Sequence, residues 1–423
     1  MADGEPRDGL LGSCRVLDLT TDGAMFCGKI LGDLGADVIQ IEPPGGSPTR
    51  GVGPFYHGDP GTERSLTWFY LGLNKRGVTL DLDKPEGREI FQQLVATADF
   101  VIESFHPGYL AGIGLGYDDL RRIKSDLVMT SITPFGQTGP YIDYQVTDIV
   151  GTALTGQMWL FGEADRAPVR IPAPQFFLQG GLQAAMGSMV AQYHREASGE
   201  GQHVDQSCQQ AMILTLMNAP QIWDFNRFNV RGGGAGTLIQ RPEPLGPIYA
   251  RSIYSCRDGY VIAWLGGGQA GRVASSKALV AWANENGHLL EFKDHDWTQV
   301  IPDITQEEID RRFNLLQGFL KTKTKQECLE RAVRDAILMI PINDVADVAN
   351  SPQLAYRGFF EDVEHAELGE KITYPSFPVR MSEMQPGVQR RAPLLGEHNA
   401  EIYGRELRIT EERLRTLKDS RVV

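Results

Sequence analysis

The residues able to perform catalysis are dispersed through this sequence of 423 residues. Its eight histidines and five cysteines occur singly, without the close spacing to one another or to acids that a zinc site requires. No serine stands in the Gly-x-Ser-x-Gly frame that exposes a nucleophile at a strand-to-helix turn. We therefore predict neither a metal site nor a serine triad.

The start of the chain is a candidate nucleotide site, because Glu42 ends a predicted strand-helix-strand unit as the ribose-binding acid does in dinucleotide folds. The turn between the first strand and the helix reads DGAMFCG from residue 22. It lacks the Gly-x-Gly-x-x-Gly spacing through which backbone amides reach a pyrophosphate. The sequence therefore argues against a dinucleotide cofactor.

Strand and helix patterns alternate through the first 130 residues. Apolar runs bounded by turn residues predict strands at 15–20, 38–41, 78–82, 100–102 and 127–132, and helical spacing predicts helices at 27–34 and 86–97. Such alternation predicts an α/β fold with a mostly parallel, Rossmann-like sheet covered by helices on both faces. Sheets of this kind bind ligands beyond the carboxyl ends of their strands.

A long helix is predicted from Gly181 to about Ala197, with one apolar stripe packed on the sheet. The stripe comprises Leu182, Ala185, Met186, Met189, Val190 and Tyr193. The run RGGGAG at 231–236 predicts a junction. We predict a large lobe formed by 1–229, a smaller α/β lobe formed by 230–335, and a segment 336–423 that returns to the large lobe.

The charge and composition limit the classes of partner that we expect for this chain. The net charge of −13 repels nucleic acid and anionic membrane surfaces, so we expect neither as a partner. Five widely spaced cysteines argue against a disulfide framework and favour a reducing cytoplasm. The first residues, MADGEPRDGLLGS, have the pattern of neither a signal peptide nor a membrane anchor.

Seven strings, in order along the chain, resemble those of the class III coenzyme A transferases, also called the carnitine-dehydratase and bile-acid-inducible family. They are VLDLT (16–20), LGDLGADVIQIEPPGG (31–46), LNKRGVTLDL (73–82), ADFVIESFHPGYLAGIGLGY (98–117), TPFGQTGPY (133–141), SGEGQHVDQS (198–207) and GEHN (396–399). The resemblance implies two lobes per chain, with both terminal segments in the large lobe, and two chains threaded through each other as an interlaced dimer.

The resemblance also implies a coenzyme A thioester at the strand ends of the large lobe. The family binds it through backbone and side chains of the segments that read LDLDK and ESFHPG in this sequence. The binding residues implied here are Leu80, Lys84, Ser104, Phe105, Pro107 and Tyr109.

The catalytic aspartate of the family is missing from this chain. In active members it stands four residues before a glycine of the long helix and attacks the acyl thioester to form a mixed anhydride. That glycine is Gly181 here, and the aspartate position is Phe177. Residues 173–181 contain no acid and no hydroxyl side chain. Related racemases place a histidine before an aspartate, where this chain has Thr147 and Asp148, so we predict no catalytic residue.

Other departures from the family concern turns and cations. The Ala-Gly-Pro turn after the first strand is Gly23, Ala24 and Met25, and an arginine and a lysine typical of the family are Pro43 and Asp83. The string ENFRPG has become ESFHPG, with Ser104 and His106. Fewer cations weaken the binding of a polyphosphate, so coenzyme A need not occupy this chain's own site.

We interpret the chain as the catalytically silent subunit of a hetero-oligomeric transferase, with the covalent aspartate supplied by a homologous partner subunit. It resembles one subunit of a transferase that moves coenzyme A from succinyl-coenzyme A to an aromatic succinate in anaerobic aromatic degradation. Two alternatives stay open. One is a stand-alone lyase, hydratase or racemase-like enzyme acting through Glu103, His106 or Asp148, and the other is a non-enzymatic dimer that binds a coenzyme A thioester.

Overall fold

The computed structural model describes residues 9–163, 165–232, 234, 236–239, 245–298 and 303–423. The chain forms two compact units, the first from Met1–Gln157, Arg170–Pro220 and Ala355–Val423, the second from Met158–Val169 and Gln221–Leu354. The units change over at 220 and 354, whereas the sequence patterns placed the boundaries at 229 and 335. The predicted junction 231–236 lies partly outside the described residues, at 233 and 235.

A six-stranded parallel sheet forms the centre of the first unit, in the order β3-β2-β1-β4-β5-β6. Its strands are β1 (Arg15–Leu19), β2 (Asp37–Glu42), β3 (Lys75–Thr79), β4 (Phe100–Glu103), β5 (Val128–Thr133) and β6 (His203–Ser207). The strand order reverses between β1 and β4. Such a switch point opens a crevice at the carboxyl ends of the two strands, where open α/β sheets bind ligands. The α/β fold with a parallel sheet is confirmed.

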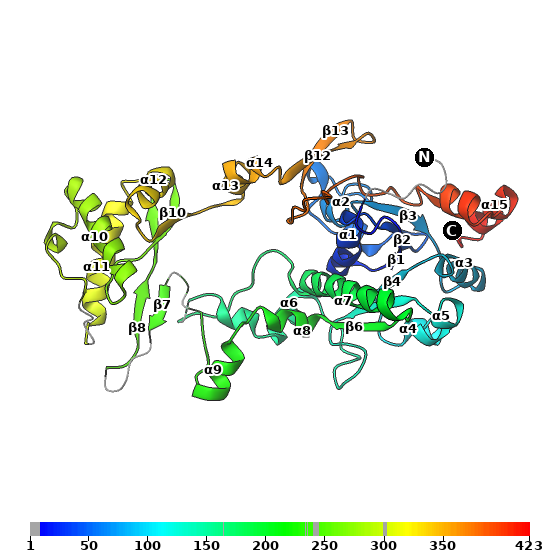
Figure 1. Cartoon of the computed structure of the whole chain (residues 1–423), viewed down its shortest axis with the longest axis horizontal. Helices are drawn as coiled ribbons and strands as arrows, with labels where there is room; N and C mark the ends of the chain where they lie inside the picture. Colours follow the sequence, from blue (N-terminus) through cyan, green and yellow to red (C-terminus); the bar gives the residue numbers. More distant parts are fainter. Residues whose placement is uncertain (1–8, 164, 233, 235, 240–244, 299–302) are drawn as a thin grey trace. The chain divides into compact units, whose positions relative to one another are not determined.

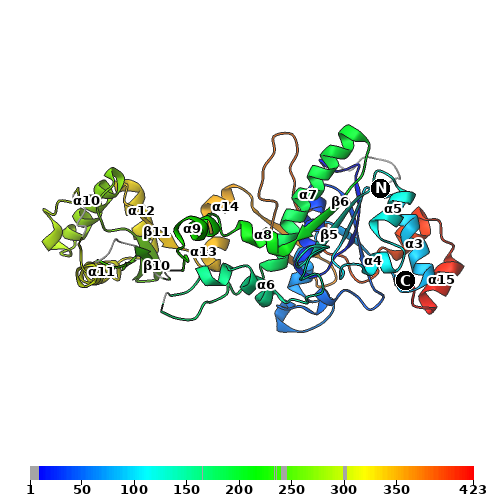
Figure 2. The ribbon, with the colours of Figure 1, turned by 90° about the horizontal axis from the view of Figure 1, so that it is seen from below.

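Helices cover both faces of this sheet (Figure 1). α1 (Phe26–Asp33) and α7 (Phe176–Ser198) pack on one face, and α3 (Pro85–Val95) and α5 (Tyr117–Ile123) on the other, as Figure 2 shows from a second side. The remaining elements of this unit are η1 (Asp22–Met25), η2 (Pro48–Gly51), η3 (Tyr56–Gly58), α2 (Leu66–Leu71), α4 (Tyr109–Gly112), α6 (Asp148–Leu154), α8 (Cys208–Leu214), β12 (Phe360–His365), β13 (Glu370–Pro375), η6 (Ala400–Glu406) and α15 (Glu411–Asp419).

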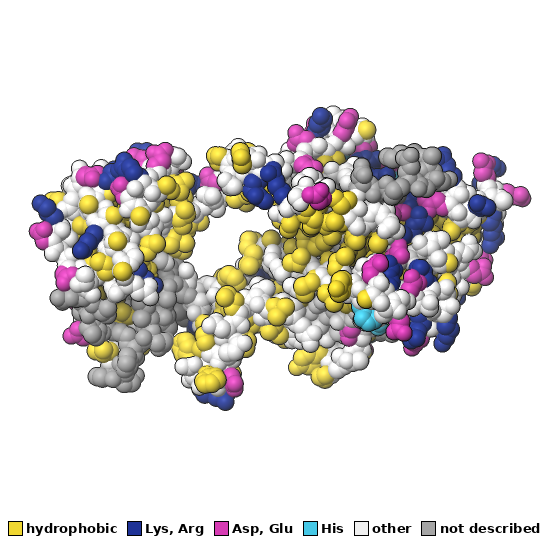
Figure 3. Space-filling model, in the orientation of Figure 1, with side chains coloured by type: hydrophobic (Ala, Val, Ile, Leu, Met, Phe, Trp, Pro, Cys, Tyr) yellow, Lys and Arg dark blue, Asp and Glu magenta, His cyan; other side chains and the backbone are white. Residues whose placement is uncertain are grey.

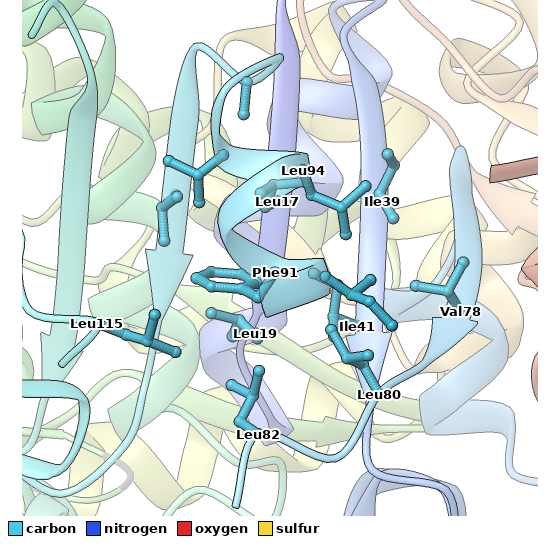
Figure 4. Packing of buried hydrophobic residues seen from close by; sticks show 14 of the residues in the cluster. Leu17, Leu19, Ile39, Ile41, Val78, Leu80, Leu82, Phe91, Leu94 and Leu115 are labelled. Atoms are coloured by element: carbon cyan, nitrogen blue, oxygen red, sulfur yellow. The ribbon is translucent and has the colours of Figure 1, made fainter. Parts of the chain in front are cut away.

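Alternation along the strands divides the core into two layers. Leu17 of β1 belongs to the layer under α3, whereas its neighbour Val16 belongs to the layer under α7. Figure 4 shows Phe91 and Leu94 of α3 lying over the strands that contribute Leu17 and Ile39. Because all five side chains are fully or almost fully buried, each stabilises the fold by about 1.5–3 kcal/mol relative to exposure.

The C-terminal segment extends the sheet edge through the GEHN string. The Gly77 amide donates a hydrogen bond to His398 Nδ1 (3.1 Å), and the His398 amide donates one to the Gly77 carbonyl (2.9 Å). Asn399 accepts the Thr79 amide at 2.9 Å. These bonds satisfy backbone groups of the edge strand β3 that no further strand pairs with. The segment from 355 onward therefore belongs to the first unit.

The second unit has its own core around Trp282, Leu316 and Phe319. Its elements are α9 (Ala219–Asn226), β7 (Gly236–Ile239), β8 (Ile248–Arg251), β9 (Ile253–Cys256), β10 (Gly259–Ala263), α10 (Ala270–Glu285), η5 (Leu290–Phe292), α11 (Gln306–Leu320), α12 (Lys325–Asp335), β11 (Met339–Ile342) and α13 (Val345–Ala349), with η4 (Gln157–Leu160) and α14 (Pro352–Tyr356) at the change-overs. β10 pairs antiparallel with both β9 and β11.

The long helix differs from its prediction in two respects. It begins at Phe176, five residues before Gly181. Four members of its predicted apolar stripe are exposed in this chain, since Leu182, Met186, Val190 and Tyr193 are 41%, 59%, 65% and 79% exposed. The helix packs on the sheet as predicted, but mainly through small residues, Ala184, Ala185, Ser188 and Ala191. Of the predicted stripe, only Ala185 and Met189 take part in this packing.

Candidate functional site

The candidate site lies at the carboxyl ends of β1 and β4. The amide of Thr21, two residues after β1, donates to Ser104 Oγ at 3.0 Å, directly after β4. The next amide, of Asp22, donates to Thr49 Oγ1 at 2.7 Å. These two bonds fix the turn after β1 against its neighbours on both sides. Thr21, Asp22 and Ser104 therefore lie at the switch point of the sheet, at the carboxyl ends of β1 and β4.

A buried ion pair between Lys75 and Asp18 stabilises this turn. Lys75 Nζ contacts Asp18 Oδ2 at 2.7 Å, and both side chains are fully buried. The other oxygen of Asp18 accepts the amide and the hydroxyl of Thr20 at 2.9 and 2.6 Å. Lys75 also donates to the Met25 carbonyl and to Gln40 Oε1, both at 3.0 Å. With its donors satisfied, Lys75 acts as a structural cation rather than as a ligand for substrate.

The first turn of α7 lies against the turn after β1. A side chain added at Gly23 would come within 3.0 Å of Phe177 Cβ and within 2.6 Å of the Leu178 amide nitrogen. Gly181 makes a similarly close approach to the Gly23 carbonyl. Only glycine permits these contacts. They place the partly buried Phe177, the position at which the resemblance implies an aspartate, beside the turn after β1.

Asp148, the first residue of α6, is an acid in contact with the start of α7. Its Oδ1 accepts the amides of Gln175 and Phe176 at 2.7 and 2.8 Å. These are orphan donors at the start of α7, and a carboxylate there is further stabilised by the helix dipole. Asp148 therefore caps α7, and that role accounts for its position beside the start of this helix.

Glu103, the last residue of β4, carries a buried carboxyl group. Its Oε2 accepts the Phe105 amide at 2.7 Å, and Ser131 donates a further hydrogen bond to it. Burial raises the pKa of Glu103 to about 7, a change that these two bonds oppose and that nearby Asp205 increases. Ser131 Oγ lies 2.8 Å from His203 Nε2 on the next strand. The row Glu103, Ser131 and His203 crosses β4, β5 and β6, and Tyr117 of α5 stacks on His203.

The residues implied as coenzyme A ligands occupy different environments. The rings of Phe105 and Tyr109 contact each other at a tilt of 41°, with centroids 4.8 Å apart, and the Tyr109 hydroxyl donates to Asp83 at 2.7 Å. Leu80 is only 2% exposed and belongs to the core. Lys84 Nζ donates to the carbonyls of residues 420 and 421 at 2.5 and 2.9 Å, beyond the end of α15. Burial, with the Asp83 bond second, raises the pKa of Tyr109 to about 12.

The ligand role of these six positions stays a prediction. Phe105 and Tyr109 are brought together in the structure, and Ser104 joins the turn after β1. Pro107 contributes a carbonyl that lies 3.0 Å from His106 Nδ1. His106 itself is half exposed, with Nε2 3.7 Å from the exposed carboxylate of Asp143. No buried partner orients this imidazole as a general base would be oriented.

Sequence reasoning did not single out Asp22, the first residue of η1. It is exposed, it stands at the switch point, and its backbone is left-handed with φ 49°. Aspartate is one of the few residues that adopt this conformation. The available signal was a polar residue directly after a predicted parallel strand, a place where functional side chains gather.

The comparisons with known proteins agree along the whole chain. The sequence profile of CoA-transferase family III matches residues 11–399. The chain belongs to CoA-transferase family III. The BbsE subunit of succinyl-CoA:(R)-benzylsuccinate CoA-transferase from Thauera aromatica is 36% identical to it over 92% of each chain. The succinyl-CoA–D-citramalate CoA-transferase of Chloroflexus aurantiacus is 32% identical over 98% of each chain.

Solved structures give the same result for the fold of this CoA-transferase family III chain. A CAIB/BAIF family protein from Brucella suis superposes with a TM-score of 0.79 at 28% identity, covering 94% of this chain and 99% of that one. The resemblance drawn from the seven strings is therefore confirmed, and coenzyme A thioesters are the substrates of the family to which the chain belongs. Within the described part of the chain, no group of three or more His, Cys, Asp or Glu side chains could hold a metal ion. Nor is any described helix both long and apolar enough to cross a membrane.

Proposed function

We propose that this chain is the catalytically silent subunit of a hetero-oligomeric class III CoA-transferase, and that the aspartate which carries the acyl group belongs to a homologous partner subunit. The observation that carries the proposal is Phe177 in the first turn of α7, against Gly23 of η1, which follows β1. A benzyl group stands where the transfer reaction needs a carboxylate.

The chemistry explains why this substitution matters. A carboxylate attacks the thioester carbonyl, the carbon–sulfur bond breaks, and the acyl group remains on the enzyme as a mixed anhydride while coenzyme A leaves as its thiolate. The neighbouring Gln175 and Gln179 carry amides, which form no such anhydride. Asp148 offers a carboxylate, but its Oδ1 is occupied by two backbone amides. None of these three side chains is available as the nucleophile, and we propose that the partner subunit supplies it.

An unpaired apolar surface on α7 supports the presence of a partner chain. Leu182, Met186, Val190 and Tyr193 repeat at helical spacing along its exposed side. In Figure 3 hydrophobic side chains gather over the region of α7 on this face of the first unit. Contiguous exposed apolar side chains of this kind are typical of subunit interfaces. A homologous subunit would bury them, in line with the interlaced dimer that we predict.

The relatives support the division of labour and suggest the substrates. The relative from Thauera aromatica is named as one subunit of a transferase, and a second relative, 29% identical, is named as the beta subunit of a succinyl-CoA–L-malate CoA-transferase. We propose that the complex moves coenzyme A from succinyl-CoA to a carboxylic acid, an aromatic succinate being the first candidate, in the cytoplasm during aromatic degradation.

Reconstitution tests the proposal. The chain is expressed alone and together with its aspartate-bearing homologue, and succinyl-CoA-dependent transfer is measured in each preparation. We expect turnover only in the mixture, unchanged within about twofold by Phe177→Ala and abolished by replacing the partner's aspartate. Borohydride or hydroxylamine trapping followed by mass spectrometry should label the partner alone. A covalent adduct on this chain, or turnover by this chain alone, would overturn the proposal.

The geometry gives less support to the alternative that this chain is a stand-alone lyase, hydratase or racemase-like enzyme. Asp148 caps α7, His106 lies on the surface near Asp143, and Glu103 is buried beneath the Phe105 amide. No two of these three groups contact each other as an acid and a base on one substrate would.

A further inference from the structure

Glu103, Ser131 and His203 form a hydrogen-bonded row across the sheet that the proposed transfer chemistry does not use. The strand registers place Glu103 opposite Ser131, and Ser131 opposite Asp205, two residues after His203. Glu103 is also opposite Leu19, which belongs to the core layer under α3. Because side chains alternate between the two faces of a sheet, all four polar residues lie on this face. The row therefore leads from a buried carboxyl group to the edge strand β6, where His203 is exposed.

The Ser131 hydroxyl has one proton to share between two neighbours. Its oxygen lies 2.8 Å from His203 Nε2 and is also hydrogen-bonded to the Glu103 carboxyl group. When a hydroxyl donates to one neighbour, the other neighbour has to donate to it. Either Glu103 is protonated and Ser131 donates to His203 Nε2, or Nε2 is protonated and Ser131 donates to Glu103. The hydroxyl therefore couples the proton on Glu103 to the proton on His203 Nε2.

The other groups at the carboxyl end of the row are acceptors or amides. Glu103 Oε2 accepts the Phe105 amide at 2.7 Å, and Asp205 Oδ1 accepts the Gln137 amide at 3.0 Å. Within the part of the chain that the structure describes, no Lys or Arg forms an ion pair with Glu103 or Asp205. His203 is therefore the group in this row that can take up a positive charge.

The surroundings of His203 keep its imidazole neutral near neutral pH. The ring of Tyr117 on α5 stacks on it with centroids 5.5 Å apart, and Arg121 Cζ lies 5.8 Å from the Tyr117 ring centroid. Partial burial lowers the pKa of the His203 imidazole, an effect that Asp205 and Asp118 oppose. A neutral imidazole presents Nε2 as a donor or as an acceptor according to its tautomer, so both arrangements of the row are open to His203.

We propose that Ser131 and His203 relay protons between solvent and the buried carboxyl group of Glu103. In the first step the Glu103 proton moves to Ser131 Oγ while the hydroxyl proton of Ser131 moves to His203 Nε2, which leaves a carboxylate and an imidazolium. The imidazolium then releases its Nδ1 proton to water from the exposed strand β6. One proton passes from Glu103 to water, the hydroxyl turns toward Glu103, and the tautomer of His203 is reversed. The relay does not depend on the silent-subunit proposal.

The relay makes the turn after β4 sensitive to pH. Once ionised, Glu103 accepts the Phe105 amide in a charge-assisted hydrogen bond, which is roughly twice as strong as a bond between neutral groups. The preceding residue, Ser104, accepts the amide of Thr21 at the switch point of the sheet. Loss of the Glu103 proton therefore strengthens the bond that holds this turn beside the end of β1.

The tautomer of His203 in the purified full-length chain tests the relay. The chain is labelled with ¹³C and ¹⁵N at histidine, the His203 signals are assigned through His203→Gln, and the ring shifts are followed from about pH 6.5 to about pH 8.5. The measurement is repeated on Ser131→Ala, which removes the bridge, and on Glu103→Gln, which removes the titrating group. Ser198→Ala is the matched control, because Ser198 Oγ makes a similar contact, 3.2 Å from His194 Nδ1, at the exposed end of α7.

We expect more than about half of the neutral His203 rings to carry the proton on Nδ1 at pH 6.5, and fewer than about one fifth at pH 8.5. Ser131→Ala and Glu103→Gln should each abolish this change, and Ser198→Ala should leave it intact. A His203 tautomer that is the same at both pH values overturns the inference. So does a change that persists in Ser131→Ala or, if that variant does not fold, in Glu103→Gln.

Discussion

Replacing Glu103 with glutamine should remove the part of the pH dependence of folding stability that comes from this carboxyl group. The folded pKa is about 7 and the reference value 4.5, so the folded chain retains a proton that the unfolded chain has already lost between these values. Stability from this group is fully present below about pH 4.5 and disappears as pH rises through about 7. Between pH 5 and pH 8 the loss amounts to about 2.5 kcal/mol.

Glutamine is neutral at every pH and can still accept the Phe105 amide, so Glu103→Gln should remove this slope. Urea unfolding of the native chain and the variant, followed by circular dichroism from pH 5 to pH 8, measures it. The variant should gain about 2–3 kcal/mol relative to the native chain across that range. Glu89→Gln, on the exposed side of α3, serves as the control and should show a constant difference.

A difference between Glu103→Gln and the native chain that stays constant within about 0.5 kcal/mol from pH 5 to pH 8 would refute the reasoning. It would mean that water reaches the Glu103 carboxyl and that burial does not govern its ionisation. The direction of the effect is itself diagnostic, because a carboxylate stabilised by a cation would give stability that rises with pH.

Three further substitutions test the structural roles assigned above. Asp148→Asn should cost about 1 kcal/mol in urea unfolding by weakening the cap of α7, and a loss below about 0.3 kcal/mol would contradict that role. Lys75→Met should destabilise the first unit by about 3–5 kcal/mol, because Asp18 is then buried without its cation, and a variant as stable as the native chain would contradict the pairing. Val190→Lys should prevent co-purification with the partner subunit without changing the circular dichroism spectrum, whereas Val333→Lys, at a still more exposed valine on α12, should leave assembly intact.

The local sequence pattern predicted an element correctly where all side chains of that element have the same environment. The apolar runs from Val16 to Leu19 and from Phe100 to Ile102 predicted strands that are found at β1 and β4. Parallel strands buried on both faces read as continuous apolar runs, which is why these predictions succeeded. The absence of an acid between 173 and 181 is likewise a property of the sequence alone.

The long helix shows where pattern failed. Its larger apolar side chains, such as Met186 and Val190, predicted a buried stripe, but the helix packs through Ala184 and Ser188. Periodicity reports that one face is apolar and does not say which chain covers it. The start of the helix was also misplaced, because the cap comes from Asp148, 27 residues before the first capped amide, and no local rule detects it.

The sequence by itself determined the family, the parallel sheet and the absence of a carboxylate at Phe177, since each depends on residue type and order. Only the tertiary structure decided that Gly23 and Phe177 lie against each other, that Asp148 caps α7 and that burial raises the pKa of Glu103 to about 7. These features depend on contacts between segments far apart in the chain, and on burial, which local spacing does not encode.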